Sequence, residues 1–397
     1  MKLAGRLAHI EPFYVMECAK AARLIADSPA CNPAQGGERM LFLNIGEPDF
    51  TAPPLVQEAA ERAIRAGKTQ YTEAMGLPAL REAISGWYAQ RFGLTIPARR
   101  IMVTAGASAA LQLACLALFE AGDEVLMPDP SYPCNRHFVA AADAVARLLP
   151  TTAAQRFQLV ADDVAQAWGP ATRGVLLASP SNPTGTSIHP DELRRIDAIV
   201  SGHGGISIVD EIYLGLSYDD TFGHSALRVC EGSGEHIVSV NSFSKYFSMT
   251  GWRLGWLVLP EALVAPVERL AQNLFICAST VAQQAALACF HPESIAEYER
   301  RRAEFRARRD LVVPALNRLG LTVPVMPDGA FYAYADCSAH SADSWDFAFQ
   351  LMNSAHVALT PGRDFGRHDP ARWLRLSFAS SRERLDEALH RLRRVLG

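Results

Sequence analysis

The stretch Ile237-Val-Ser-Val-Asn-Ser-Phe-Ser-Lys-Tyr-Phe-Ser-Met-Thr-Gly-Trp-Arg253 begins as an apolar strand and continues into aromatic and hydroxyl side chains around one lysine, Lys245. A lysine attacks a carbonyl only in its unprotonated form, and apolar surroundings or a nearby cation favour that form by lowering the pKa. The aromatic residues of this stretch and Arg253 meet both conditions. We therefore interpret Lys245 as a covalent catalyst; the alternative is a solvated lysine after a strand, as most lysines are.

The surroundings of Lys245 also predict a cofactor. A Schiff-base lysine beside anion-binding groups indicates an aldehyde cofactor that carries a phosphate, which is pyridoxal phosphate. The spacing of Ser242 and Lys245 also matches the S-x-x-K motif of penicillin-binding enzymes, which need S-D-N and K-T-G elements as well. Neither string occurs in the chain, and G-x-G-x-x-G is absent too. Serine acylation and nicotinamide chemistry are therefore disfavoured.

Outward from this stretch, short apolar runs alternate with helical stretches. The runs lie at residues 101–103, 125–127, 175–178, 206–209, 237–240 and 254–259. Such alternation predicts an α/β fold with a mainly parallel sheet covered by helices on both faces. Ligands of such sheets bind at the carboxyl ends of the strands, where the polar candidates described below lie.

The pattern changes after residue 290. The expected elements are a long charged helix over 292–319, strands over 331–335, 357–359 and 373–378, and a last helix from about 382. This order is typical of a smaller α+β domain, which the N-terminal helix over 15–26 and strand over 41–43 are expected to join. The predicted divisions are an N-terminal segment over 1–45, a large cofactor-binding domain over 46–290 and a small domain over 291–397.

Composition excludes several classes of protein. The 397 residues are 49% hydrophobic and 20% charged, as in globular proteins, and the net charge of −4 argues against a nucleic-acid partner. Arginines between 300 and 309 spread around a helix and predict a solvated helix. No apolar window reaches the ~18 residues of a membrane span. The eight cysteines lack a C-x-x-C pair and the histidines lack zinc-ligand spacing, so we expect reduced thiols, a cytoplasmic location and no metal.

An anion-binding loop is predicted after the first of these strands. The sequence Thr104-Ala-Gly-Ala-Ser108 opens a helix of small and apolar residues. Free backbone N–H groups and the helix dipole favour an anion at this position, and Ser108 adds a hydroxyl. The alternative is that Ser108 is a plain N-cap.

Two rigid loops follow later strands. In Asp129-Pro-Ser-Tyr-Pro133, the ring of Tyr132 can lie flat on a planar cofactor, unless it belongs to the core. In Ser179-Pro-Ser-Asn-Pro-Thr-Gly185, two prolines and a glycine fix the amide of Asn182, which can donate to a phenolate or a carboxylate.

The strand at 206–209 ends in Asp210-Glu-Ile-Tyr213. A carboxylate at the end of a buried strand must be paired, because isolation is costly or shifts its pKa. A protonated pyridine nitrogen suits Asp210, since the ring can then accept the electrons released when the substrate Cα–H bond breaks. Tyr213 can then reach the ring hydroxyl. The alternative is that Asp210 caps a neighbouring helix.

Two groups are candidates for substrate binding. Arg375 lies between hydrophobic neighbours in Trp373-Leu-Arg-Leu-Ser-Phe378, and a guanidinium on a rigid strand offers a fork to a carboxylate. An internal salt bridge is the alternative. Gly46 either lets the backbone approach a ligand or is an ordinary turn glycine.

Together these motifs resemble the fold-type-I aminotransferases that use pyridoxal phosphate, specifically the class I/II group with a bacterial aspartate-aminotransferase-like arrangement. The resemblance extends from the loop over 44–49 to the strand with Arg375, and includes N-P-T-G, D-E-x-Y, S-x-S-K and G-W-R-x-G elements. It implies a seven-stranded sheet in the large domain and a homodimer. It also implies ping-pong transfer of an amino group from an L-amino acid to a 2-oxo acid through Lys245.

The resemblance implies a role for each candidate residue. Lys245 would hold the cofactor aldehyde and move the substrate proton, and Asp210 would pair with the pyridine nitrogen. The residues expected around the ring are Tyr213 and Asn182 at O3′ and Tyr132 stacked on the face. Those expected at the phosphate are Ala107, Ser108, Ser242, Arg253 and, from the other subunit of the dimer, Tyr71. The substrate carboxylate would bind Arg375, Asn182 and the backbone of Gly46.

One departure from the family pattern bears on the substrate. In bacterial aspartate enzymes of this group, a lysine that binds the distal carboxylate commonly stands where this chain has Ser108. Its absence, with Phe13, Tyr14 and Phe331 expected near the pocket, favours neutral or hydrophobic donors. The motifs leave open a β- or γ-lyase on the same fold. A regulatory module that binds the cofactor without catalysis is more remote, because the chain has no spare basic domain.

Overall fold

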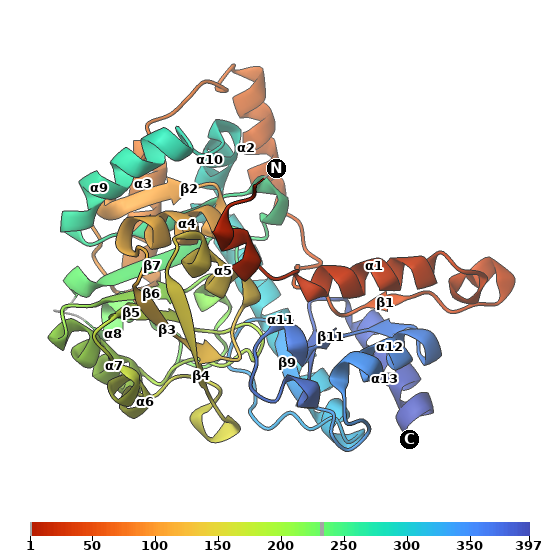
Figure 1. Ribbon diagram of the computed structural model, residues 1–397. Coiled ribbons are helices and arrows are strands. Elements are labelled where there is room, and N and C mark those ends of the chain that lie inside the picture. Colours follow the sequence, from red (N-terminus) through yellow and green to blue (C-terminus); the bar gives the residue numbers. More distant parts are fainter. Residues whose placement is uncertain (1, 231–233) are drawn as a thin grey trace.

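The computed structural model describes residues 2–230 and 234–397. A large sheet with its helices forms one part of the molecule, and the elements within residues 14–42 and 292–396 form a smaller part beside it (Figure 1). The predicted boundaries at 45/46 and 290/291 remain predictions. No helix of the described residues is long and apolar enough to cross a membrane.

The large sheet has seven strands in the order β2-β8-β7-β6-β5-β3-β4. The strands are β2 (Ile101–Thr104), β3 (Glu124–Asp129), β4 (Val145–Pro150), β5 (Thr172–Ala178), β6 (Ile206–Asp210), β7 (Ile237–Ser242) and β8 (Gly255–Val258). Every pair is parallel except those of β8, which runs opposite to β7 and β2. The predicted mainly parallel sheet is therefore confirmed.

No apolar run predicts β4. This strand lies at the edge of the sheet, and its residues alternate between exposed and half-buried positions, with Val145 56% exposed. An edge strand needs no continuous apolar run, because water covers part of it. It was therefore missed among the runs that mark the buried strands.

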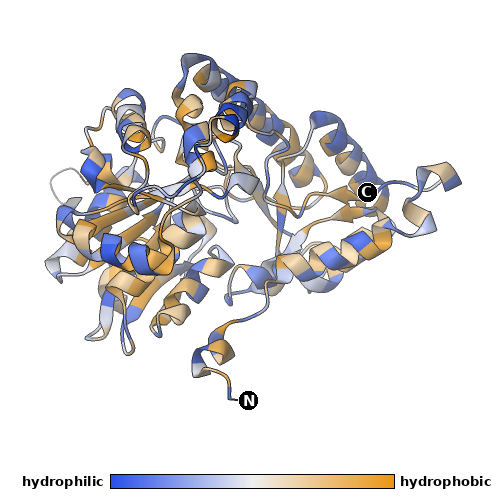
Figure 2. Cartoon of the chain, turned by 90° about the horizontal axis from the view of Figure 1, so that it is seen from above, coloured by the Kyte–Doolittle hydropathy of each residue, from blue (hydrophilic) through white to orange (hydrophobic). Residues whose placement is uncertain are grey.

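Helices cover both faces of the large sheet. Neighbouring residues of one strand belong to two separate cores: Ile208 to one and Val209 to the other. Apolar strands lie inside and helices with polar outer faces lie around them (Figure 2). The helices are α2 (Pro54–Arg65), α3 (Pro78–Phe92), α4 (Gly106–Leu118), α5 (Pro133–Ala141), α6 (Ala161–Ala167), α7 (Pro190–Gly202), α8 (Ala226–Val229), α9 (Glu261–Leu274) and α10 (Thr280–Ala286).

The smaller part combines both ends of the chain. Its elements are α1 (Tyr14–Ala26), β1 (Leu41–Phe42), α11 (Pro292–Arg318), β9 (Tyr332–Asp336), α12 (Ser344–Ser354), β10 (Val357–Ala358), β11 (Thr360–Pro361), β12 (Trp373–Ser377) and α13 (Arg382–Leu396). β1 pairs in parallel with β10, and β12 lies between β11 and β9 in an antiparallel sheet. In the structure, the N-terminal strand β1 thus pairs with a C-terminal strand.

The prediction of a solvated arginine helix is wrong for one face of α11. Arg301, Arg308 and Arg309 are buried there. The guanidinium of Arg308 donates to Asp49 at 2.8 Å and to Glu304 at 3.0 Å, and that of Arg301 donates to the carbonyl of Thr51 at 2.6 Å. These partners satisfy the buried charges, which the helical pattern alone did not reveal. They also fix the loop that follows Gly46.

Candidate active site

A cavity of about 410 Å³ opens at the carboxyl ends of β5, β6 and β7 and is closed on the other side by the smaller part. Every predicted site residue except Tyr71 lines it. These residues are Gly46, Ala107, Ser108, Tyr132, Asn182, Asp210, Tyr213, Ser242, Lys245, Arg253 and Arg375. Residues up to 329 positions apart in sequence thus meet at the predicted edge of the sheet.

Lys245 lies in the turn after β7. Its ammonium donates to the carbonyl of Gly46 at 2.7 Å and lies 5.7 Å from the ring centres of Tyr213 and Phe331. Burial lowers the pKa of Lys245 to about 8; the nearby charge of Glu47 opposes this shift, while Arg375 and Arg253 add to it. A lysine with this pKa has a substantial unprotonated fraction near neutral pH, as a nucleophile toward a carbonyl requires.

Asp210 ends β6 and is buried at the cavity wall. Within the described residues it accepts one backbone hydrogen bond, from Ile212 at 3.2 Å, and forms no ion pair. Burial therefore raises its pKa to about 7. The bond from Ile212 lies in the turn that follows β6, so Asp210 does not cap a neighbouring helix. A cation inside the cavity would restore an ordinary carboxylate here.

Tyr213 is buried, and its hydroxyl lies 2.7 Å from that of Tyr332 in β9. Burial raises its pKa well above the usual value, so the phenol keeps its proton. A protonated phenol donates one hydrogen bond and accepts others, which suits a contact to a phenolate oxygen. Both hydroxyl groups lie on side chains that line the cavity.

The start of α4 provides an anion-binding cradle. Ala105 at the N-cap has no side chain that satisfies the free N–H groups of the first turn, which include those of Ala107 and Ser108. Gly106 has φ +81°, and a Cβ there would lie 2.5 Å from Arg253 Nη2, so only glycine admits the guanidinium. The hydroxyls of Ser242 and Ser244 line the same end of the cavity. Together these groups fit a phosphate.

Arg375 in β12 forms no ion pair among the described residues. Its guanidinium donates to Asn182 Oδ1 at 2.8 Å, to the carbonyl of Asn44 at 2.6 Å and to Thr360 Oγ1 at 3.3 Å. The internal salt bridge considered from the sequence is therefore absent from this region. A buried, hydrogen-bonded cation without a carboxylate partner suits an anionic ligand.

Tyr132 is half-buried directly before α5, and its ring contacts Phe13 edge to face at 6.3 Å. Tyr71 lies in the loop between α2 and α3, is 80% exposed and does not line the cavity. One chain alone thus leaves Tyr71 outside the site.

Of the three aromatic residues expected near the pocket, Phe13 lines the cavity. Phe331 is fully buried behind Tyr213 but lies near the pocket, with its ring centre 5.7 Å from the ammonium of Lys245. Tyr14 does not line the cavity, and its ring contacts Trp345 edge to face at 5.8 Å. The sequence reasoning missed the neighbour of Phe331, Tyr332, which does line the cavity. Strand alternation was the available signal, since adjacent residues face opposite sides.

These groups fit the predicted cofactor. The cradle matches a phosphate, the unpaired Asp210 matches a protonated ring nitrogen, and Lys245 is placed to react with an aldehyde between them. A Cβ at Gly46 would lie 2.1 Å from the hydroxyl of Tyr332, so the backbone approaches the site as only glycine permits.

Comparison with known proteins agrees with this geometry. The family described as aminotransferase class I and II matches residues 38–392. The valine–pyruvate aminotransferase of Mycobacterium tuberculosis is 38% identical over 97% of this chain and 96% of its own length. An aspartate aminotransferase of Pyrococcus abyssi is 34% identical over 91% of this chain and 93% of its own length.

Solved structures show the same fold. A crystal structure of an aminotransferase from Mycobacterium tuberculosis has a TM-score of 0.92 and 37% identity, covering 100% of this chain and 99% of that chain. The aspartate aminotransferase of Thermus thermophilus with maleate has a TM-score of 0.90 and 33% identity, covering 100% of both chains. The chain therefore belongs to the class I and II aminotransferases, fold-type-I enzymes that use pyridoxal phosphate.

Proposed function

We propose that this aminotransferase takes neutral aliphatic L-amino acids as donors. The observation that carries the proposal is the wall of the cavity formed by the N-terminal segment. Its apolar residues that line the same cavity as Lys245 are Phe13, Val15, Met16, Ala19 and Ile45. Apolar surface of this kind stabilises an aliphatic side chain and leaves a second carboxylate without hydrogen bonds.

The charges of the cavity support the same donors. The cofactor is the proposed partner of Lys245 and Arg253, and the donor α-carboxylate is the proposed partner of Arg375. Ser108, where aspartate enzymes commonly have a lysine, is uncharged. The remaining cation that lines the cavity is Arg23 of α1, whose side chain is exposed at the rim. An exposed, solvated cation contributes little to recognition.

The relatives point to two donor classes. The name of the Mycobacterium tuberculosis relative, valine–pyruvate aminotransferase, agrees with an aliphatic donor and suggests pyruvate as an acceptor. Several relatives are named aspartate aminotransferases, and Arg23 is the group through which an acidic donor would be recognised. Aspartate is therefore the second candidate, and it predicts that Arg23→Gln abolishes the aspartate activity.

We further propose the following roles for the residues of this site. Pyridoxal phosphate, when bound, supplies an aldehyde for the donor amine and a ring that accepts the electron pair of the broken Cα–H bond. Lys245 would take the proton from Cα of the donor and hold it for return. Asp210 would hold the protonated ring nitrogen, and Tyr213 and Asn182 would hold the ring oxygen. Tyr132 would contact the ring.

Positioning is shared between the two parts of the molecule. The groups proposed for the phosphate are Ala107, Ser108, Ser242, Arg253 and, additionally, Ser244. The fork of Arg375 orients the donor α-carboxylate, and Asn182 and the Gly46 backbone complete its contacts. Because the cofactor phosphate and the donor α-carboxylate would both be fixed, the Cα–H bond of the donor would be held near Lys245. This positioning lowers the entropic part of the activation barrier.

We propose a homodimer in which Tyr71 completes the phosphate site of the partner subunit. The support is the surface near this loop: Tyr71 is 80% exposed, and Leu274 and Ile276 are 47% and 51% exposed. Aromatic side chains of this exposure are typical of interfaces. Mixing Tyr71→Ala and Lys245→Ala chains should restore one intact site per mixed dimer; no recovery of activity contradicts the shared site. From the cysteine pattern we also propose a cytoplasmic location.

The donor proposal is tested by steady-state kinetics with pyruvate as acceptor. Valine, leucine, isoleucine, aspartate and glutamate are compared by kcat/KM. The proposal expects the branched aliphatic donors to lead. A preference for aspartate that Arg23→Gln removes supports the second candidate instead. The lyase is tested separately with cysteine, whose thiol is a β-leaving group: release of sulfide with ammonia and pyruvate, without any acceptor, would indicate the lyase.

A further inference from the structure

Helix α1 is capped by a residue from the far end of the chain. Phe13 occupies its N-cap position and offers no side-chain acceptor. The carboxylate of Asp364 accepts the N–H of Tyr14 at 2.9 Å and that of Val15 at 3.3 Å. These two N–H groups belong to the first helical turn, where a backbone N–H has no i−4 carbonyl of the same helix to donate to. Asp364 therefore fixes where α1 begins.

Asp364 is itself fixed from several sides. It is fully buried, and its carbonyl accepts from both terminal nitrogens of Arg136 at 3.3 Å. The next residue, Phe365, lies 4.9 Å from the guanidinium of Arg375 and accepts the N–H of Ser131 through its carbonyl at 2.8 Å. The short segment over 362–365 thus contacts α1, the proposed carboxylate-binding residue Arg375, and the loop that leads to Tyr132.

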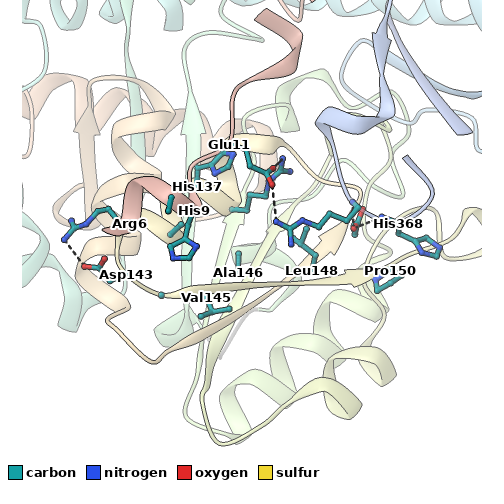
Figure 3. Close-up of a pocket in the computed structure, with 16 residues that line it drawn as sticks. Arg6, His9, Glu11, His137, Asp143, Val145, Ala146, Leu148, Pro150 and His368 are labelled. Carbon is teal, nitrogen blue, oxygen red and sulfur yellow. Dashed lines mark hydrogen bonds and ion pairs between the residues drawn. The ribbon is translucent and has the colours of Figure 1, made fainter. Parts of the chain in front are cut away.

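The chain before α1 is attached by few contacts. The 3-10 helix over Gly5–His9 buries no residue, and it lies beside a cavity of about 720 Å³ (Figure 3). Its ion pairs join Arg6 to Asp143 at 3.0 Å, and Glu11 to Arg136 and Arg367, each at 3.2 Å. The pairs of Arg6 and Arg367 are exposed and hold the segment weakly, whereas Arg136 is buried. The buried bonds of Asp364 act on α1 itself and fix its first turn directly.

The start of α1 forms part of the donor pocket. Phe13, Val15 and Met16 line the cavity, and Phe13 also contacts the ring of Tyr132. We propose that Asp364 is a positioning residue for donor recognition: it holds the first turn of α1 so that this apolar wall contacts the donor side chain. Asp364 itself lies outside the cavity lining and acts through α1. The inference rests on the proposed aliphatic donor specificity.

The test separates binding of the side chain from binding of the carboxylate. The cofactor-loaded dimer is titrated calorimetrically with acetate and with 3-methylbutanoate, which carry the same carboxylate but differ by an isopropyl group. The variants are Asp364→Ala, which removes the cap, and Asp364→Asn, which keeps one acceptor and the volume. The control is Ser381→Ala, which removes the cap of α13, whose N–H bond comes from Arg384.

We expect the wild type to bind 3-methylbutanoate more tightly than acetate. Asp364→Ala should reduce the ratio of the 3-methylbutanoate affinity to the acetate affinity about fivefold, because loss of a helix cap destabilises the first turn of the helix. Asp364→Asn should reduce this ratio less. Acetate affinity and the Ser381→Ala ratio should stay near the wild-type values. An unchanged ratio in a folded Asp364 variant overturns the inference, and Asp364→Asn decides if Asp364→Ala does not fold. A wild type without preference for 3-methylbutanoate contradicts the proposed donors instead.

Discussion

Replacement of Arg375 by lysine tests the substrate site most sharply. In the structure, one terminal nitrogen of Arg375 donates to Asn182 and the other to the carbonyl of Asn44 and the hydroxyl of Thr360. The guanidinium also lies 4.5 Å from the ring centre of Tyr332. A lysine keeps the charge, but its single ammonium cannot present two parallel N–H groups to a carboxylate while satisfying these partners.

The expected loss follows from the missing arm of the fork. One hydrogen bond to a charged group contributes ~1.5–3 kcal/mol. At ~1.4 kcal/mol per factor of ten, this loss corresponds to a donor affinity about 10- to 150-fold weaker. The cofactor should bind as before, because the cradle at the start of α4 and Lys245 are unchanged.

The assay is the half-reaction of the cofactor-loaded enzyme with a single donor, combined with calorimetric titration of acetate. Arg372→Lys is the matched control, since Arg372 lies on the surface at the start of the same strand and pairs with Asp336. Both readouts should weaken for Arg375→Lys and stay constant for Arg372→Lys. If acetate and donor affinities of Arg375→Lys equal those of the wild type, Arg375 does not bind the α-carboxylate.

Three further changes probe other parts of the site. Lys245→Ala should lose turnover and the visible absorption of the bound cofactor, whereas Lys68→Ala, on the surface, should keep both; turnover without Lys245 would refute its role. The folded pKa of Asp210 is about 7 against an ordinary 3.8, so in the cofactor-free protein its burial costs stability as the pH rises through this interval and costs nothing below it. Asp210→Asn should therefore raise the Tm of the cofactor-free protein near pH 8 more than near pH 4, and a pH-independent difference in Tm would speak against an unpaired buried carboxylate. Ser108→Lys should raise kcat/KM for aspartate relative to valine by about tenfold, because it supplies a charge-assisted hydrogen bond to a distal carboxylate; an unchanged ratio would show that the pocket does not extend to this position.

The sequence predicted those features that follow from local chemistry. Buried parallel strands must be apolar throughout, so the runs that end in Asn241 and Asp210 were visible, and ligands of such sheets bind at those ends. The aromatic residues around Lys245 also predicted that its pKa is lowered, and burial is the main cause of this shift in the structure. A site residue in a rigid loop or at the end of a strand can be predicted from the local sequence, because its position depends little on distant parts of the chain.

Features that depend on tertiary partners were not predictable in this way. The arginines of α11 looked solvated, because a partner of the buried Arg308, Asp49, lies more than 250 positions away. Tyr332 was overlooked in favour of Phe331, since the face of a short strand is fixed only by its pairing with β12. The cap that Asp364 provides to α1 likewise joins residues 349 and 350 positions apart.

The most direct test of the whole account mixes the cofactor-loaded enzyme with valine in the absence of any oxo acid. We predict that the visible absorption of the lysine-bound cofactor is replaced by near-ultraviolet absorption, with one equivalent of 3-methyl-2-oxobutanoate formed per site and no ammonia. The account is contradicted if the visible absorption persists with valine, leucine and alanine alike, or if ammonia is released while the absorption recovers.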